Sequence, residues 1–194
     1  MITESNKKYF VWIIVVSVLL VYGSLILITQ DVNNINLKNW AKIIPTTVTI
    51  ELLFYWLFVK WGWKWKILHS WLVVTPDLSG EWQGKIHYIW DGKEGDRETK
   101  IKISQTFNHI IITLATEESV SRSILAGFDI DEKRGIYDLY YTYVNEPKIT
   151  IQNRSAIHYG TTKFHFDLAN LLELKGEYWT SRDTKGTIEL NKIK

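Results

Sequence analysis

The sequence contains no cysteine, only three prolines and only one methionine among its 194 residues. Without cysteine there is no disulfide, no thiolate nucleophile and no cysteine-ligated metal, so a disulfide-stabilised secreted domain is excluded. The sequence also has no large excess of positive or negative charge, because 23 Lys and Arg nearly balance 21 Asp and Glu and leave a net charge of +2. That balance lacks the basic excess typical of proteins that bind duplex nucleic acid. A small anionic ligand stays open as an alternative, since it needs one or two cations rather than a broad basic surface.

Enzyme motifs are also missing. The chain contains no nucleophile elbow, no phosphate-binding P-loop and no HExxH zinc motif. Its histidines lack the spacing and the acidic neighbours of a metal site; they are His69, His87, His109, His158 and His165. We therefore expect no catalytic residues, no metal and no cofactor.

Two apolar stretches near the N-terminus are present instead. Residues 9–28 carry no charge over twenty residues, and a helix of that length spans about 30 Å, the thickness of a bilayer core. Residues 43–59 form a second, shorter apolar run with a single acid, Glu51, and with Pro45 expected in the first helical turn. A cleaved signal peptide is the alternative for the first run, but the run exceeds the usual apolar region and no small-x-small cleavage site follows.

These runs predict a division into three parts. Residues 1–66 form a two-span transmembrane region, residues 67–75 a linker, and residues 76–194 a ligand-binding domain. A polar turn over residues 29–42 connects the two spans.

The lysines that flank the spans predict the orientation. The flanks that hold the two termini carry five of them, Lys7, Lys8, Lys60, Lys64 and Lys66, whereas the connecting turn carries only Lys38 and Lys42. By the positive-inside rule, both termini and the C-terminal domain are expected in the cytoplasm. Trp61, Trp63 and Trp65 alternate with the last of these lysines, a pattern typical of the lipid–water interface.

Glu51 lies near the middle of the second span. An acid in hydrocarbon is costly unless it is protonated or paired, and it usually faces another helix or a polar cavity. One interpretation is a protonated carboxyl bonded to Thr47 or to a backbone carbonyl. The other is a functional contact between protomers or the lining of an opening.

From Leu78 onward the hydrophobic pattern has a period of two. We count eight strands of about eight to eleven residues, separated by short polar turns, with no helical period between them. Hairpin-length links favour a small eight-stranded up-and-down, lipocalin-like β-barrel over a sandwich. Glycines inside strands suit the sharp bends of such a barrel; they are Gly84, Gly127, Gly160 and Gly176.

The inner face of this barrel combines aromatic with polar side chains. Eight strands enclose either a packed core or one small ligand. Strand parity places inside the candidate ligand-binding residues Trp82, Tyr88, Gln105, Arg122, Tyr141, His158, Thr162, Tyr178, Thr180 and Arg182. Aromatic rings suit stacking on a nucleobase, and the planar guanidinium suits phosphate. Ordinary core filling is the alternative for each ring, and a β-bulge would turn Arg122 outward. Arg182 is expected at a strand end, either at the mouth of the barrel or in solvent.

The order of these features resembles a known family. Two spans and a Trp/Lys segment precede a β domain that opens LSGEWQG, residues 78–84, and closes LKGEYWTSRDTKG, residues 174–186. Over nearly its whole length the chain is similar to the two-transmembrane, β-strand-rich effectors of CBASS, the bacterial cyclic-oligonucleotide antiphage systems. The resemblance implies that the barrel binds a cyclic dinucleotide made by a partner nucleotidyltransferase. It also implies that binding drives homo-oligomerisation and disruption of the bacterial inner membrane.

Two other functions stay open from the residues themselves. A membrane-anchored barrel could bind a fatty acid or another apolar molecule. It could also be a structural adaptor with a filled interior and no ligand. The lipid alternative predicts an apolar interior, and the adaptor alternative predicts that no small molecule stabilises the domain.

Overall fold

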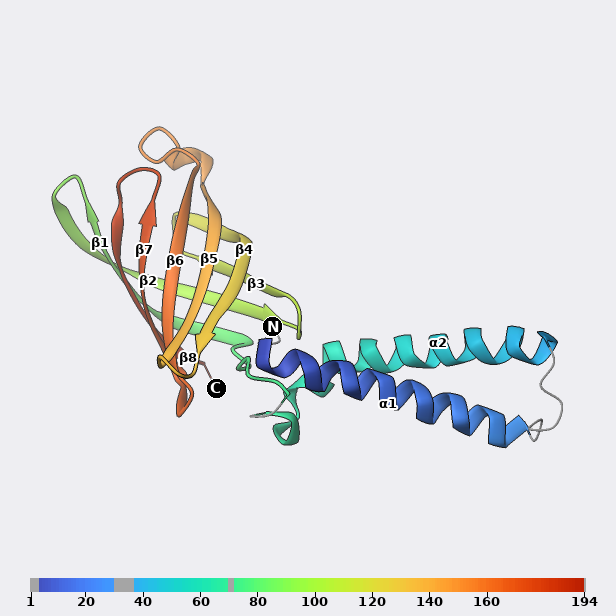
Figure 1. Cartoon of the computed structure of the whole chain (residues 1–194). Helices are drawn as coiled ribbons and strands as arrows, with labels where there is room; N and C mark the ends of the chain where they lie inside the picture. The colour runs from blue at the N-terminus through green and yellow to red at the C-terminus, as the bar shows by residue number, and fades with distance from the viewer. Residues whose placement is uncertain (1–3, 30–36, 70–71, 194) are drawn as a thin grey trace. The chain divides into compact units, whose positions relative to one another are not determined.

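The computed structural model describes residues 4–29, 37–69 and 72–193. The chain separates into two compact units, Ile2–Val74 and Thr75–Lys194. The first unit contains helices α1 (Glu4–Thr29) and α2 (Leu37–Lys60), and then the short 3-10 turns η1 (Gly62–Lys64) and η2 (Lys66–Leu68) (Figure 1).

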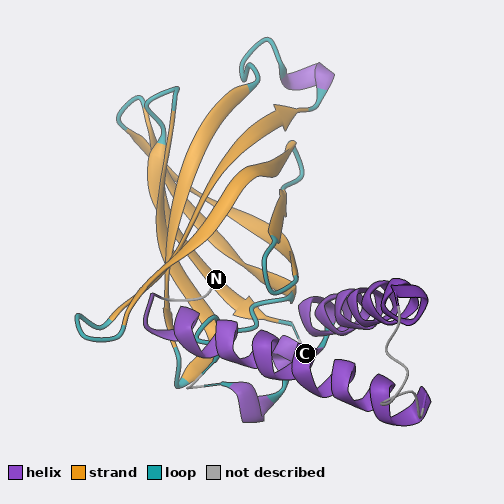
Figure 2. Ribbon diagram, turned by 45° about the vertical axis from the view of Figure 1, so that its right-hand side comes forward, coloured by secondary structure: helices purple, strands orange, loops and turns teal. Residues whose placement is uncertain are grey.

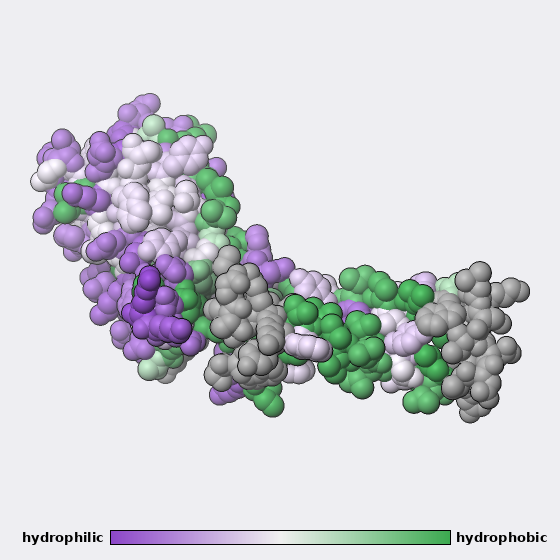
Figure 3. Space-filling model, viewed as in Figure 1, coloured by the Kyte–Doolittle hydropathy of each residue, from purple (hydrophilic) through white to green (hydrophobic). Residues whose placement is uncertain are grey.

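Both helices are long and apolar enough to cross a bilayer, over Val11–Ile28 and Ala41–Lys60. Their described side chains are mostly exposed, and they form the green, hydrophobic part of the surface in Figure 3, whereas the barrel surface is mainly purple or pale. A helix satisfies its backbone hydrogen bonds internally, as hydrocarbon surroundings require. The two expected apolar helices are thereby confirmed.

The second helix starts earlier than expected. Residues 37–42, predicted as part of the polar turn, belong to α2, while residues 30–36 of that turn lie outside the described residues. Pro45 therefore lies inside the helix rather than in its first turn, because LKNWAK is itself a good helical segment. One backbone hydrogen bond is lost there. The hydroxyls of Thr47 and Thr49 donate to the carbonyls of Ile43 and Pro45, at 2.9 and 2.8 Å.

The acid of the second span has a partner on the first. Ser17 Oγ donates to Glu51 Oε2 at 3.0 Å, while Glu51 Oε1 is buried without a hydrogen-bond partner among the described residues. The partner is thus neither Thr47 nor a backbone carbonyl, the two groups that the sequence suggested. A free carboxylate oxygen leaves Glu51 with capacity for one more donor.

The second unit is a closed antiparallel barrel in the order β1-β2-β3-β4-β5-β6-β7-β8 (Figure 2). Its strands are β1 (Gly80–Trp90), β2 (Lys93–Gln105), β3 (Ile110–Ala115), β4 (Ser119–Asp131), β5 (Ile136–Pro147), β6 (His158–Asp167), β7 (Asn170–Thr180) and β8 (Lys185–Lys192). The 3-10 turn η3 (Ile149–Ile151) lies between β5 and β6. The pairing of β1 with β8 closes the barrel and confirms the expected up-and-down fold. At this seam a side chain on Gly84 would lie 1.8 Å from the carbonyl oxygen of Glu189, so only glycine fits.

The part of the barrel next to the start of β1 is a packed core. Its buried members include Trp82, Leu139, Phe164, Phe166 and Leu174, and alternation along the strands points them inward. The chain enters the barrel at this end. Gln105 spans the entrance, since its Oε1 accepts from the Leu78 amide at 3.0 Å and its Nε2 donates to the Pro76 carbonyl at 2.8 Å.

A β-bulge interrupts β4. The register with β5 shifts between Ser123 and Leu125, which adds one residue to β4 and reverses its inward parity. Ser121 therefore points inward in the first half of the strand, and Phe128 packs on the core in the second. This single shift decides the position of Arg122.

Candidate ligand-binding site

A cavity of about 290 Å³ lies at the end of the barrel opposite to the chain entrance. The β1–β2, β3–β4, β5–β6 and β7–β8 connections surround this end, and the β5–β6 connection with η3 is the longest of them (Figures 1 and 2). The volume is near the lower limit of ligand pockets in proteins. The wall is made of aliphatic and aromatic side chains with hydroxyls and guanidinium groups among them.

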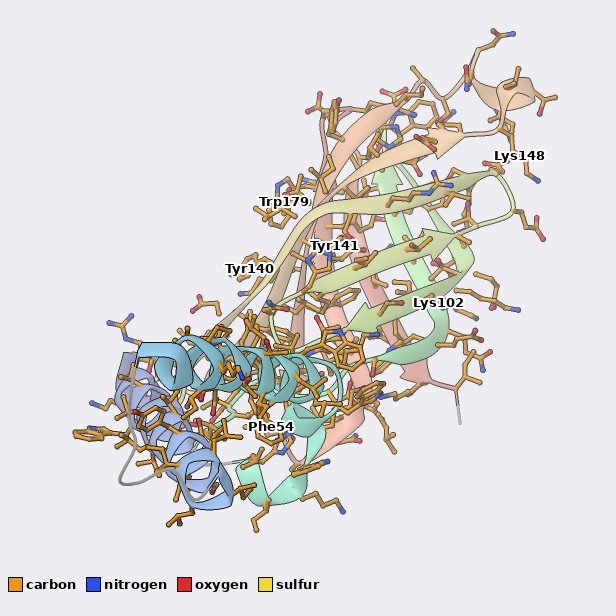
Figure 4. All side chains as sticks on the ribbon, turned by 90° about the vertical axis from the view of Figure 1, so that its right-hand side faces the viewer. Phe54, Lys102, Tyr140, Tyr141, Lys148 and Trp179 are labelled. Atoms are coloured by element: carbon orange, nitrogen blue, oxygen red, sulfur yellow. The ribbon has the colours of Figure 1, made fainter. Side chains whose placement is uncertain are left out.

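Two buried hydroxyls lie at the inner limit of the cavity. Tyr141 on β5 and Thr162 on β6 are direct cross-strand partners with exposed fractions of 2% and 0%. Among the described residues, neither hydroxyl has a hydrogen-bond partner beyond the other hydroxyl; burial raises the pKa of Tyr141, and the Thr162 hydroxyl is close enough to oppose that rise. Figure 4 shows Tyr141 turned into the barrel, whereas Tyr140 and Trp179 project from its outer side. Buried hydroxyls without partners are uncommon and leave hydrogen-bonding capacity for a ligand.

Tyrosine rings form much of the wall. Burial raises the pKa of both Tyr141 and Tyr178 to about 12, and it raises the pKa of Tyr143 as well, with the two neighbouring phenols adding to that shift. All three phenols therefore stay protonated at neutral pH and can donate a hydrogen bond. A side chain at Gly160 would lie 2.4 Å from the Tyr143 ring, so only glycine leaves room for this ring.

The rim carries two arginines that share one carboxylate. Arg97 Nη2, from β2, lies 2.8 Å from Glu118 Oε2 in the β3–β4 turn. Arg154, from the β5–β6 connection, donates to Glu118 Oε1. The guanidinium of Arg97 also lies over the ring of Tyr88, 5.8 Å from its centre. Three separate segments of the chain thus meet in one ion-pair cluster at the rim.

A third arginine lies on the same rim. Arg182 Nη1 donates to Ser155 Oγ at 2.6 Å, and its guanidinium carbon lies 5.6 Å from the centre of the Trp90 ring. Beside it, burial lowers the pKa of His158; the hydrogen bond to the Ala156 carbonyl opposes this shift, and the positive charge of Arg182 adds to it. His158 is therefore mostly neutral at pH 7, while the rim keeps more positive than negative charge.

The structure brings six of the predicted site residues to this cavity: Tyr88, His158, Thr162, Tyr178, Thr180 and Arg182. Tyr141 is the cross-strand neighbour of Thr162 and packs in the core without lining the cavity itself. Trp82 and Gln105 are inside the barrel but at its other end, where Trp82 Nε1 donates to the Leu78 carbonyl at 3.0 Å.

Arg122 points away from the cavity. It lies on the outer surface, exposed over 56% of its side chain, and forms an ion pair with Glu146. The bulge after Ser123 is the cause, because parity counted back from Phe128 through this bulge gives the wrong side. The inward position expected from strand parity is therefore corrected.

Several cavity residues were not predicted. Arg97 has the same parity as the inward residues Ile101 and Ile103, so extending the alternation of β2 backward would have found it. Arg154 and Glu118 lie in connections, where no period indicates the direction of a side chain. Asn145, which accepts a hydrogen bond from Ser121 at 2.8 Å inside the cavity, continues the inward alternation of Tyr141 and Tyr143 along β5, so the same extension of the period would have found it.

The fold and the site define a β-barrel receptor for a small ligand, on a chain with two candidate membrane helices. A family model of the Cap15 cyclic dinucleotide receptor domain matches residues 73–192. The chain is 35% identical over 155 residues to CD-NTase-associated protein 15 of Staphylococcus schleiferi, which covers 80% of this chain and 81% of the relative. It is also 35% identical over 143 residues to the protein of the same name from Yersinia aleksiciae, and this match covers 73% of this chain and 66% of that relative. The chain belongs to the Cap15 family, and the resemblance drawn from its sequence is confirmed.

Proposed function

We propose that this chain is a membrane-bound effector of CBASS antiphage immunity, in which a cyclic dinucleotide in the barrel drives oligomerisation and disrupts the inner membrane. The receptor family supports the ligand class. The observation that carries the proposal is the cavity itself, with arginines around the rim and unpartnered hydroxyls at its inner limit. This arrangement suits a molecule with anionic phosphates at one side and a hydrogen-bonding base at the other.

In the proposed binding mode, the phosphates lie at the rim and a base points inward. Arg182 and the pair Arg97 and Arg154 contact the phosphates, since guanidinium groups donate charge-assisted bonds to them. The base lies against Tyr178 and reaches toward Thr162. Stacking on an aromatic ring contributes about 1–3 kcal/mol per base.

The membrane helices carry the second half of the proposal. Two spans in one protomer cannot enclose a pore, so several copies are required. Glu51 has one oxygen without a partner, and such a group can hold helices together in lipid. The ligand shifts this equilibrium only if it binds the assembled state more tightly than the monomer. Both termini face the cytoplasm in this arrangement, where the ligand is made by the partner nucleotidyltransferase.

The direct test is a thermal-shift measurement on the full-length chain in detergent. The probes are cyclic di-AMP, cyclic di-GMP, cyclic UMP–AMP and a fatty acid series. We expect a cyclic dinucleotide to raise the melting temperature. Stabilisation by fatty acids alone would favour the lipid-binding alternative, and no stabilisation by any probe would favour the adaptor.

The membrane step is tested by dye entry into vesicles that contain the protein. Ligand should cause dye entry with the parent chain, and Glu51→Leu should bind ligand equally well but admit less dye. Deletion of residues 1–59 should abolish dye entry. Permeabilisation by a protein that stays monomeric at saturating ligand would remove oligomerisation from the mechanism, and a C-terminal reporter active only in the periplasm would reverse the topology.

A further inference from the structure

Glu118 occupies the position at the rim where an anionic ligand would meet two of the arginines. Its Oε2 lies 2.8 Å from Arg97 Nη2, and its Oε1 accepts from Arg154 Nη2. Its own side chain is only 30% exposed, so this carboxylate is partly shielded from water. Both oxygens are used, and both partners are cations that line the cavity.

The β3–β4 turn holds this carboxylate in place. The Thr116 hydroxyl accepts from the amides of Glu118 and Ser119, at 3.3 and 3.1 Å. The Lys148 amide donates to the Glu118 carbonyl at 2.9 Å and so ties the turn to the β5–β6 connection. None of these bonds involves the side chain of Glu118. They would persist if its side chain lost its charge.

A carboxylate and a phosphate compete for the same guanidinium group. Both accept the paired N–H bonds of arginine, and both are anions, so they repel each other at close range. We propose that Glu118 is an internal competitor for the ligand's phosphates, which neutralises Arg97 and Arg154 in the empty barrel and opposes binding. This inference rests on the proposed function, because it requires an anionic ligand at this rim.

The competition favours ligands with two phosphates. Each ion pair occupies one nitrogen of its arginine, so a phosphate that takes the same N–H groups has to displace Glu118 from both arginines. The two phosphodiester groups of a cyclic dinucleotide can give each arginine a new partner, whereas a single phosphate can replace fewer of the broken pairs. Glu118 therefore sets an affinity threshold that weakly bound nucleotides do not reach.

The test is Glu118→Gln in the full-length chain, with the cyclic dinucleotide that most stabilises the parent as the probe. Glutamine keeps the shape of the side chain and removes its charge. We expect a Kd about tenfold lower at low salt, since a tenfold change needs only about 1.4 kcal/mol of removed repulsion. The Kd of the variant should also rise more steeply with salt, because its uncompensated arginines are screened more strongly.

Glu146→Gln is the matched control, since it discharges the partner of Arg122 in an outward-facing Arg–Glu pair. Its Kd should equal that of the parent. An unchanged or higher Kd for Glu118→Gln, with the parent binding normally, would overturn the competitor role and leave the proposed function intact. If neither the parent nor Glu118→Gln binds any cyclic dinucleotide, the proposed function and this inference both fail.

Discussion

The two ends of the barrel differ in whether their buried polar groups are hydrogen-bonded within the chain. At the chain entrance, Gln105 uses both its amide oxygen and its nitrogen on the backbone of residues 76–78, and Trp82 bonds to the same segment. At the cavity end, the hydroxyls of Tyr141 and Thr162 have no hydrogen-bond partner among the described residues beyond each other. Polar groups that are hydrogen-bonded within the chain stabilise a fold, whereas groups without such bonds keep the capacity to bond to a ligand. In the proposed binding mode, stability and recognition are therefore carried by different ends of the barrel.

The largest effect is expected from Trp82→Ala at the entrance. Its side chain has an exposed fraction of 0%, so truncation leaves a large cavity in the core. The free energy of unfolding should fall by about 3–5 kcal/mol. Circular dichroism during thermal denaturation of the detergent-solubilised chain measures this loss.

Trp179→Ala is the control for that experiment. The Trp179 ring is 48% exposed on the outer surface, and its loss should cost less than about 1 kcal/mol. Equal losses for the two variants would mean that the entrance is not the stabilising end. A folded Trp82→Ala fraction should still bind the ligand.

The second effect is expected from Arg182→Ala at the rim. A bond to a charged group contributes about 1.5–3 kcal/mol, so affinity for the cyclic dinucleotide should fall by roughly ten- to a hundredfold. Stability should change little, because the Arg182 side chain is bonded to Ser155 at the rim and not in the core. Isothermal titration calorimetry gives the Kd.

Arg122→Ala is the control, since this arginine faces outward and pairs with Glu146. It should bind like the parent. If both arginine variants bind like the parent, phosphate contact at this rim is wrong. If Arg122→Ala alone loses affinity, the ligand lies outside the barrel.

These controls also show how far the sequence could lead. A period of two predicted eight strands, the barrel and its inner aromatic face, because alternation follows directly from strand geometry. Parity does not say at which end of a barrel a side chain lies. It therefore grouped Trp82 and Gln105 with Tyr178 and Arg182, although they belong to opposite ends.

Local irregularities account for the other differences. The bulge in β4 adds one residue and reverses the parity of Arg122, and such a bulge has no clear signature in the letters SRSILAG. Glu118 and Arg154 lie in connections, where tertiary contacts decide the direction of the side chain. Pro45 was placed too early because polar residues before it were read as a turn, although they continue the helix.

A third, smaller effect is expected from Thr162→Val. Valine keeps the volume but removes a hydroxyl whose one neighbouring hydrogen-bonding group in the described chain is the Tyr141 phenol, so the barrel should lose little stability. Ligand affinity should fall by about three- to tenfold, since a neutral hydrogen bond contributes about 0.5–1.5 kcal/mol. Calorimetry and thermal denaturation on the same sample measure both quantities.

Thr161→Val is the matched control on the outer side of the same strand. The Thr161 hydroxyl lies 3.2 Å from that of Thr142, and its loss should leave the Kd unchanged. A lower melting temperature for Thr162→Val, with unchanged affinity, would mean that the hydroxyl serves the fold. The two ends of the barrel would then be alike.

The smallest effect is expected from pH, through His158. Burial lowers the pKa of His158 below its ordinary value of 6.5, the hydrogen bond to the Ala156 carbonyl opposes this shift, and the charge of Arg182 adds to it. Below that pH the unfolded chain binds a proton that the folded chain rejects, so the stability contributed by neutral His158 is present above it and lost as the pH falls. A phosphate paired with Arg182 would cancel its positive charge and raise the pKa of His158 again. The ligand should therefore bind more tightly, by less than about tenfold, between pH 7.5 and pH 5.5, while the empty barrel becomes less stable. Calorimetry across this range tests the link between ligand binding and the protonation of His158. His158→Asn is the control, since it should remove the pH dependence of both affinity and stability. An affinity that falls with acidification in the parent alone would place the phosphate away from this part of the rim.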